Sequence, residues 1–176
     1  MKLLITGGTV FVSRFAAEYF IARGHDVYVL NRNTRTQVHG VKLIQADRTM
    51  LCDVLKNMFF DAVIDVNAYN AEHVKSLMSA VGGLDSYVLM SSSAVYPESA
   101  PMPFTEDTKV GANKYWGEYG LGKIAAEVAA LTLFPRAYVI RPPYIYGEYN
   151  NVYREAFVFD CADSDLPFYI PDSDMT

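Results

Sequence analysis

The sequence predicts an α/β fold of the doubly wound type, in which a parallel sheet lies between two helical layers (three layers, α/β/α). Three observations predict it. Short apolar runs of strand length alternate with longer segments whose apolar residues recur every three or four positions. The runs are apolar almost throughout, as in parallel strands buried on both faces. The first run ends directly in Gly7 and Gly8, where this fold makes its first strand-to-helix turn.

The first half of the chain contains three predicted strands, at 2–6, 27–30 and 41–45. A helix follows the first strand, and Gly24 is placed to end it. The predicted buried stripe of this helix consists of Val12, Phe15, Ala16, Tyr19 and Phe20. A short helix is predicted over 51–58, where the residues with helical spacing are Leu51, Val54, Leu55 and Met58.

The second half continues the alternation. Strands are predicted at 62–66, 86–91 and 137–141, and helices at 74–81 and 119–131. Residues 97–110 form a long loop with several prolines, and loops of this length are commonly functional. Beyond residue 141 the alternation weakens, and the pattern predicts a helix over 152–162 and a short strand over 166–170.

Composition limits the classes of function. The chain has 176 residues, 51% hydrophobic and 20% charged, which is enough for one domain with a sizeable core. Its net charge of −5 argues against a nucleic-acid partner, which would require clustered Lys and Arg. Cys52, Cys161 and the three histidines have no metal-ligand spacing, so no metal site is predicted. No apolar run is long enough to cross a membrane and no signal peptide is recognisable, so we expect a cytoplasmic protein.

Tyr119 and Lys123 place a phenol and an amine four residues apart in a segment rich in helix formers. Four residues is about one helical turn, so both side chains lie on one face. A lysine ammonium beside a phenol stabilises the phenolate, which can then act as a base. Surface helices often carry this pair without a function, so the spacing alone leaves both interpretations open.

The turn after the first strand is a candidate phosphate site. In a doubly wound fold, the amides of this turn and of the helix start face the pyrophosphate of a dinucleotide. A full fingerprint has glycine at 7, 10 and 13, whereas this chain has Val10 and Ser13. The branched Val10 side chain would crowd a phosphate and disfavours a positive φ, so an ordinary strand–turn–helix is the alternative. The predicted cofactor contacts here are Gly7, Gly8, Thr9, Val10, Phe11 and Val12.

The ends of the other strands bear on the choice of ligand. Asn31 and Arg32 close the second strand, where an acidic residue would bind the ribose of NAD and an arginine accommodates the 2′-phosphate of NADP. The sequence therefore favours NADP over NAD, with a solvated Arg32 as the alternative. Asp47 either accepts from the adenine amino group or caps the predicted helix near Thr49, and Asp47 and Arg48 are both expected cofactor contacts. Residues 91–93 are three serines at the carboxyl end of a central strand, where ligands bind in open α/β sheets.

Four motifs in this order resemble the extended short-chain dehydrogenase/reductase family, the NAD-dependent epimerases and dehydratases of sugar nucleotides. They are TGGT at 6–9, SSSAVY at 91–96, YGLGK at 119–123 and RPPYIYG at 141–147. The resemblance implies a Rossmann fold with a catalytic set of Ser92, Tyr119 and Lys123, in which Tyr119 is the base and Lys123 also binds the cofactor ribose. It further implies that the nicotinamide side of the pocket is flanked by Arg141, Pro142, Tyr146 and Gly147.

Within this family, residues 63–69 and the Asn31-Arg32 pair resemble the atypical branch, which includes chloroplast RNA-binding relatives. Asn67 and Ala68 then belong to the expected cofactor site. The implied organisation is a dinucleotide-binding Rossmann domain over 1–150, with 151–176 as the start of a substrate-binding lobe that is mostly missing. The implied partners are a small-molecule substrate such as a nucleotide sugar, and a second copy in a homodimer.

The implied reaction is hydride transfer to a nicotinamide coupled to proton transfer to Tyr119. Ser92 would bind the reacting oxygen. A second acid or base could come from Glu98, Glu106 or Glu118, although solvated charges are the alternative for each. Two other classes remain open from sequence: a Rossmann protein that holds a dinucleotide or RNA without turnover, and a truncated domain that folds but is inert.

Overall fold

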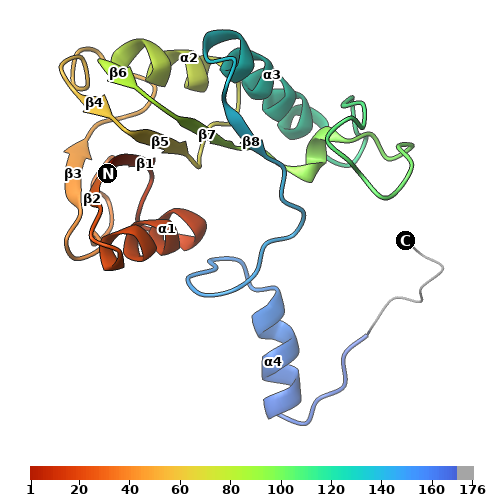
Figure 1. The fold of residues 1–176 in the computed structure, drawn as a ribbon. Coiled ribbons are helices and arrows are strands. Elements are labelled where there is room, and N and C mark those ends of the chain that lie inside the picture. Colours follow the sequence, from red (N-terminus) through yellow and green to blue (C-terminus); the bar gives the residue numbers. More distant parts are fainter. Residues whose placement is uncertain (170–176) are drawn as a thin grey trace.

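The computed structural model describes residues 1–169, and its main body is a six-stranded sheet between two helical layers (Figure 1). The strand order is β3-β2-β1-β5-β7-β8, and every neighbouring pair is parallel. This is the doubly wound order, so the predicted fold class is confirmed. The strands are β1 (Lys2–Thr6), β2 (Asp26–Asn31), β3 (Lys42–Gln45), β5 (Ala62–Asp65), β7 (Tyr87–Met90) and β8 (Tyr138–Ile140).

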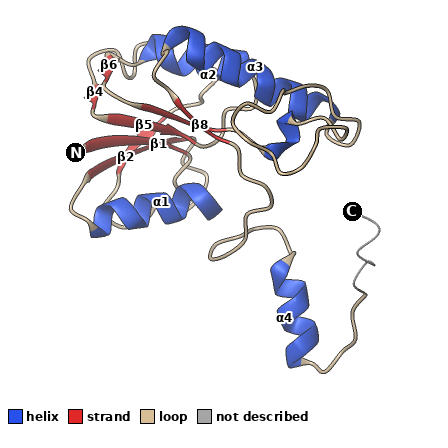
Figure 2. Ribbon diagram, turned by 45° about the vertical axis from the view of Figure 1, so that its right-hand side comes forward, coloured by secondary structure: helices blue, strands red, loops and turns tan. Residues whose placement is uncertain are grey.

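Helices cover both faces of this sheet (Figure 2). Helix α1 (Phe11–Ala22) lies on one face, while α2 (Ala71–Ala80) and α3 (Gly117–Leu133) lie side by side on the other. A fourth helix, α4 (Glu155–Asp163), projects away from the sheet at the end of a long connection from β8. Among residues 1–169, no helix is both long and apolar enough to span a bilayer.

Two apolar clusters hold the layers together, and β1 contributes to both because successive side chains point to opposite faces. Leu4 packs with Val63 and Leu89 beneath α2 and α3, whereas Ile5 packs with Val29 against α1. All five of these side chains are fully buried. Burial on both faces is the reason that these strands read as continuous apolar runs rather than as an alternation.

The buried face of α1 matches the predicted stripe only in part, because Ala16 and Phe20 pack against the core but two other positions are exposed. Phe15 and Tyr19 are 52% and 42% exposed, and their rings stack on each other at 6.3 Å between centroids. The fully covered positions are Ser13 and Ala17, whose small side chains let the helix approach the sheet closely. The end of the helix is as predicted, because Gly24 has a φ of +75° and its amide donates to the Ile21 carbonyl at 2.8 Å.

Two further expectations need correction, and one small sheet was not predicted. Residues 51–58 form successive tight turns rather than a helix, as in the Val54 amide donating to the Leu51 carbonyl at 3.1 Å. Residues 166–169 are not in a strand, and residue 170 lies outside the described residues. A small parallel sheet of β4 (Phe59–Phe60) and β6 (Gly83–Leu84) was not predicted, because two-residue strands carry no periodicity.

The carboxyl end of β5 carries a fully buried carboxylate, Asp65. Arg48 forms a two-pronged ion pair with it, with Nη1–Oδ1 and Nη2–Oδ2 distances of 2.8 and 3.0 Å. The hydroxyls of Thr6 and Tyr87 also donate to Asp65, at 2.9 and 2.8 Å. Burial beside this carboxylate raises the pKa of Tyr87. The network therefore ties β1, β5, β7 and the segment after β3 together at one edge of the sheet.

We expect Arg48→Ala to lower the free energy of unfolding by about 3 kcal/mol or more, because it leaves a buried carboxylate without its counter-charge. Urea denaturation measures the loss, and Arg35→Ala on the exposed surface is the control. A loss below about 1 kcal/mol would mean that the pair contributes no more than a surface ion pair.

Candidate functional site

A cleft of about 630 Å³ opens at the carboxyl ends of β1, β2 and β5. It is bounded by the turn between β1 and α1, by the segments after β2 and β3, and by the segment between β5 and α2. This is the crevice in which doubly wound sheets bind ligands. Ten predicted cofactor residues line it: Gly7, Thr9, Val10, Phe11, Val12, Asn31, Arg32, Asp47, Arg48 and Asn67. Four others do not: Gly8, Ala68, Lys123 and Pro142.

The first turn requires both of its glycines. Gly7 has a φ of +95°, and a Cβ there would lie 2.9 Å from the Ser13 hydroxyl. Gly8 has a φ of +90°, and a Cβ there would lie 2.4 Å from a methyl of Val29. The turn is therefore packed tightly between β2 and α1, and a side chain at either position would not fit.

Val10 does not take the positive φ that a glycine fingerprint would suggest. Its φ is −138°, an extended conformation in which it precedes the first residue of α1. The left-handed conformation falls instead on Phe11, with a φ of +43°. The Val10 side chain still lines the cleft, while the Ser13 hydroxyl donates to the Val10 carbonyl at 2.9 Å. The expected backbone strain at Val10 is thus absent, and the crowding of the cleft by its side chain stays a prediction.

Asn31 and Arg32 have different roles at the end of β2. The side-chain amide of Asn31 donates to the Gly7 carbonyl at 2.7 Å and to the Gln37 side chain at 3.0 Å, so it holds the first turn in place. Arg32 is exposed at the cleft. Asp47 takes the capping alternative: it accepts from the amide and hydroxyl of Thr49 at 2.9 and 2.7 Å, and these hydrogen bonds lower the pKa of Asp47.

Arg48 forms part of the cleft wall, but most of its hydrogen-bond donors are already bound to other residues of the protein. Besides Asp65, it donates to the side chain of Asn67 and, at 2.9 Å, to the carbonyl of His73. Its Nε is buried and has no hydrogen-bond partner among the described residues. Asp65 was not singled out from the sequence, although a carboxylate that ends an apolar strand is a signal of a buried pair.

Lys123 projects from α3 into the interior, where it is only 2% exposed. Its Nζ donates to the carbonyls of Ala68 and Met90, both at 2.8 Å, and lies 5.8 Å from the ring centre of Tyr119. Tyr119 is 40% exposed, so the phenol stands at the surface and the amine beneath it. Burial lowers the pKa of Lys123 to about 8.

Two glycines of the YGLGK motif set this geometry. A Cβ at Gly120 would lie 2.5 Å from the carbonyl oxygen of Ala94, and one at Gly122 would lie 2.4 Å from that of Tyr69. Alpha-carbon hydrogens alone fit at these contacts, so α3 packs directly on the segments after β5 and β7. The motif therefore brings Tyr119 and Lys123 to the same edge of the sheet as the cleft.

Ser92 lies just after β7, and its hydroxyl accepts from the Ala94 amide at 3.2 Å, which caps a short 3₁₀ helix (Ser93–Val95). The next residue, Ser93, donates its amide to the Pro142 carbonyl at 2.9 Å. Pro142 is thereby placed beside Ser92 rather than in the cleft. The cap occupies one acceptor position of the Ser92 hydroxyl and leaves its proton available to a ligand.

Arg141 is held within the protein. Its guanidinium makes a two-pronged ion pair with Glu127 of α3, at 2.9 and 2.7 Å, and donates to the Tyr96 hydroxyl at 3.1 Å. Glu127 is nearly buried and also accepts from the Ser91 hydroxyl. These contacts raise the pKa of Arg141 and fasten the end of β8 to α3. Arg141 therefore supports the segment that follows it.

Exposed aromatic rings lie near Tyr119. The ring centre of Trp116 lies 6.2 Å from that of Tyr119 and 6.4 Å from that of Tyr144, and the ring centre of Tyr69 lies 6.3 Å from that of Tyr119. These rings come from three segments that are distant in sequence. Only the fold brings them together, so periodicity could not have identified them as a group.

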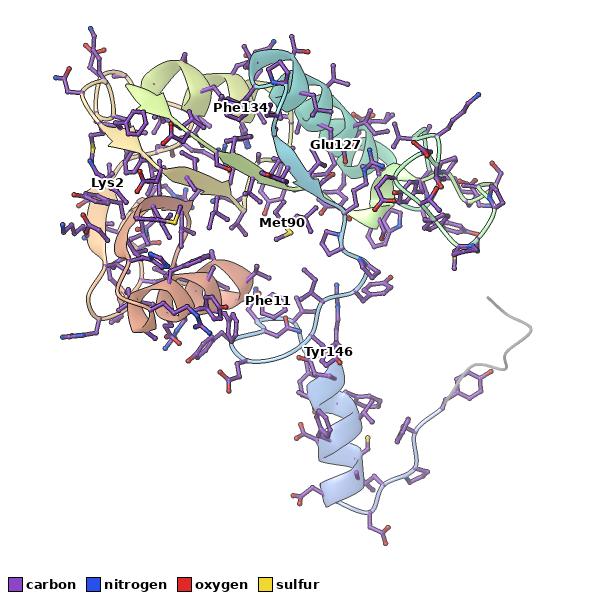
Figure 3. The ribbon with its side chains drawn as sticks, viewed as in Figure 1. Lys2, Phe11, Met90, Glu127, Phe134 and Tyr146 are labelled. Atoms are coloured by element: carbon purple, nitrogen blue, oxygen red, sulfur yellow. The ribbon has the colours of Figure 1, made fainter. Side chains whose placement is uncertain are left out.

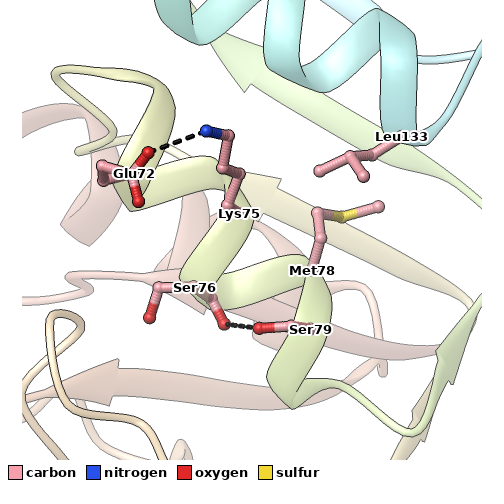
Figure 4. Close-up of a pocket in the computed structure, with 6 residues that line it drawn as sticks. All are labelled: Glu72, Lys75, Ser76, Met78, Ser79 and Leu133. Atoms are coloured by element: carbon pink, nitrogen blue, oxygen red, sulfur yellow. Dashed lines mark hydrogen bonds and ion pairs between the residues drawn. The ribbon is translucent and has the colours of Figure 1, made fainter.

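A second groove, of about 480 Å³, lies between α2 and the end of α3 (Figure 4). Figure 4 shows the Lys75–Glu72 ion pair at its rim and Met78 facing Leu133. It contains neither a buried titratable group nor a tight backbone turn, so it has less chemistry to offer than the cleft. No group of acidic, histidine and cysteine side chains suited to a metal occurs among residues 1–169.

Comparison with known proteins agrees with this architecture. The chain is 26% identical over 190 residues to the chloroplast stem-loop binding protein of 41 kDa b of Arabidopsis thaliana, covering 98% of this chain and 49% of that protein. It is 25% identical over 181 residues to UDP-glucose 4-epimerase of Corynebacterium glutamicum, covering 86% of this chain and 54% of the relative. The chain thus spans about half the length of these curated relatives.

A solved structure has the same fold. The Bordetella bronchiseptica enzyme WbmG, in complex with NAD and UDP, superposes with a TM-score of 0.76 at 16% identity, over 96% of this chain and 61% of that one. The sequence model of the NAD dependent epimerase/dehydratase family matches residues 3–159. This chain belongs to the NAD-dependent epimerase/dehydratase family.

Proposed function

We propose that this chain carries the cofactor and proton-transfer half of an NAD(P)-dependent epimerase/dehydratase-type oxidoreductase that acts on a hydroxyl-bearing substrate. The observation that carries the proposal is the buried Lys123 amine, held by two carbonyls 5.8 Å from the ring of the partly exposed Tyr119. A purely structural lysine would seldom be buried, because burial disfavours its charged form. The cleft lies at the same edge of the sheet.

The cleft fits a nicotinamide dinucleotide. The two glycines of the first turn leave no room for a side chain, and the first amides of α1 have no partner within the helix and would meet a phosphate placed at its amino end. Arg32 would face the adenine ribose, and Asn67 would lie beside the pyrophosphate. When bound, the dinucleotide supplies hydride acceptance and return.

Tyr119 would take the proton from the substrate hydroxyl, and its exposure leaves room for that contact. Lys123 would stabilise the phenolate by its charge and, with its third donor, reach the cofactor ribose, since two donors are already used. A pKa of about 8 keeps Lys123 mostly cationic at neutral pH. Ser92 would donate to the reacting oxygen. A nucleotide sugar is the proposed substrate, as UDP in the WbmG complex suggests.

A homodimer through α2 and α3 is part of the proposal. The outer surface of α3 exposes Leu121, Val128 and Leu131 at 43%, 61% and 44%, and the groove of Figure 4 lies beside it. Apolar side chains gathered on one surface favour association.

RNA binding without turnover is the second candidate, because one relative is a chloroplast stem-loop binding protein. The net charge of −5 opposes it, since nucleic-acid affinity depends on clustered cations. The buried Lys123 beside Tyr119 also opposes it, because a binding protein has no need of a buried amine next to a phenol.

Titration with NADPH and NADH, followed by nicotinamide fluorescence, tests the cofactor. We expect both to bind, and Arg32→Ala to weaken NADPH about tenfold by removing a charged partner of the 2′-phosphate, with NADH unchanged. Arg136→Ala, in the exposed turn between α3 and β8, is the control. Absence of binding by either dinucleotide at high micromolar concentration would overturn the cofactor assignment.

Tyr119→Phe tests the base. With UDP-glucose as probe, we expect turnover to fall by about 10²- to 10⁴-fold while dinucleotide affinity stays the same. Tyr115→Phe removes a neighbouring hydroxyl on a residue that is 74% exposed and should leave turnover unchanged. Activity that survives in Tyr119→Phe would show that another group takes the proton.

The pKa of Lys123 can be tested by measuring how the free energy of unfolding depends on pH. Its pKa of about 8 in the folded state lies below the ordinary 10.5, so the unfolded state binds more protons between these values and stability rises with pH there. From about pH 7.5 to about pH 9.5, we expect the wild type to gain about 2 kcal/mol in free energy of unfolding relative to Lys123→Met. The exposed Lys109→Met should show no such difference from wild type. If the difference in free energy of unfolding between wild type and Lys123→Met stayed constant or fell over this pH range, it would contradict the lowered pKa of the buried Lys123 amine.

A further inference from the structure

The segment that follows β8 returns to the amino end of α1. Figure 3 labels Phe11 there, next to the loop that continues beyond Tyr146. The Phe11 amide donates to the carbonyl of Tyr149 at 3.2 Å. Asn151 lines the cleft from the same segment. We name residues 147–151 the strap.

The Tyr149 side chain fixes the strap on the surface of α1. Its ring lies under the Arg14 guanidinium at 4.0 Å, and its hydroxyl donates to Glu18 Oε2 at 2.6 Å. Arg14 and Glu18, one turn apart, are themselves paired at 3.0 Å. The three side chains thus form one closed cluster. The contact with Glu18 raises the pKa of Tyr149 and lowers that of Glu18, as expected when the phenol donates to a carboxylate.

Both ends of the backbone contact lie in the left-handed region. Phe11 has a φ of +43° and Tyr149 a φ of +65°, and neither is a glycine. Residues other than glycine seldom adopt this backbone conformation, so it persists where surrounding contacts hold it. The strap contact and the Tyr149 cluster supply those contacts.

The strap occupies the position that a phosphate needs. Phe11 is the first residue of α1, and the first amides of a helix have no partner within it. A phosphate at a helix start binds these amides. In this structure a carbonyl oxygen takes the Phe11 amide, and its partial negative charge would repel a phosphate oxygen.

We infer that the strap is an autoinhibitory contact: Tyr149 holds the phosphate end of the cleft closed, and a dinucleotide binds only when the strap leaves α1. The inference rests on the proposed cofactor site. Opening the strap breaks the Tyr149 contacts, so only a fraction of the wild-type molecules have an open cleft. The dinucleotide affinity of the wild type is reduced by that fraction relative to the open cleft.

Tyr149→Phe and Glu18→Ala test the strap, because each removes the same hydroxyl–carboxylate contact from a different side. We expect NADH and NADPH to bind roughly three- to tenfold more tightly to either variant. The Phe11 amide should exchange faster with deuterium in both variants without ligand. The double variant should bind no more tightly than the tighter single one, because both changes break the contact between the Tyr149 hydroxyl and Glu18. Tyr138→Phe, with a 65% exposed side chain on β8, is the control.

The outcomes are separable. Equal or weaker dinucleotide affinity in both variants, with binding to the wild type intact, overturns the strap and leaves the cofactor site standing. Unchanged exchange of the Phe11 amide in both variants also overturns it. Failure of the wild type and of every variant to bind either dinucleotide overturns the proposed function and the strap together.

Discussion

The buried pair of Asp65 and Arg48 is the constraint on which the site depends. A carboxylate with no exposure must be neutralised, and Arg48 reaches it from the segment after β3. The same carboxylate accepts from Thr6 of β1 and Tyr87 of β7. The carboxyl ends of β1 and β5 are therefore fixed relative to each other and to the first residue of β7, and the residues that follow β1 and β5 line the cleft. A buried network of hydrogen bonds favours a single arrangement of the segments that it joins.

The second constraint is the close approach of α3. Glycines at 120 and 122 let the helix backbone touch two loops, and this contact drives the Lys123 amine between the carbonyls of Ala68 and Met90. Lys123 is thus a structural link and a candidate catalytic group at once. The Glu127–Arg141 pair, one turn further along α3, fastens β8 in the same manner. The Arg48–Asp65 ion pair thus holds the carboxyl end of β5, and the Arg141–Glu127 ion pair holds the carboxyl end of β8.

The strap adds a conformational element to this rigid edge. Most of the cleft wall consists of strand ends and tight turns, whereas the strap is irregular backbone attached through one side-chain cluster on the surface of α1. Segments with few buried contacts open at lower cost than the core does. Binding at the phosphate end would then be governed by a loop, while chemistry at Tyr119 would be governed by a helix. The two ends of the cleft would respond to different substitutions.

The sequence by itself determined the order of the six strands of the main sheet and of the helices that cover it, because runs buried on both faces and striped helices follow directly from periodicity. Local spacing also predicted that Tyr119, Lys123 and the first turn belong to a functional site, and this assignment stays a prediction. The sequence could not determine that α1 buries Ser13 and Ala17 instead of Phe15 and Tyr19, since the rotation of a helix is set by how closely it packs. Nor could it show that Asp47 caps a turn, that Arg141 forms an ion pair with Glu127, or that the Tyr149 carbonyl accepts from the Phe11 amide. Those are contacts between segments distant in the chain, and only tertiary packing decides which polar groups find partners and which remain free for a ligand.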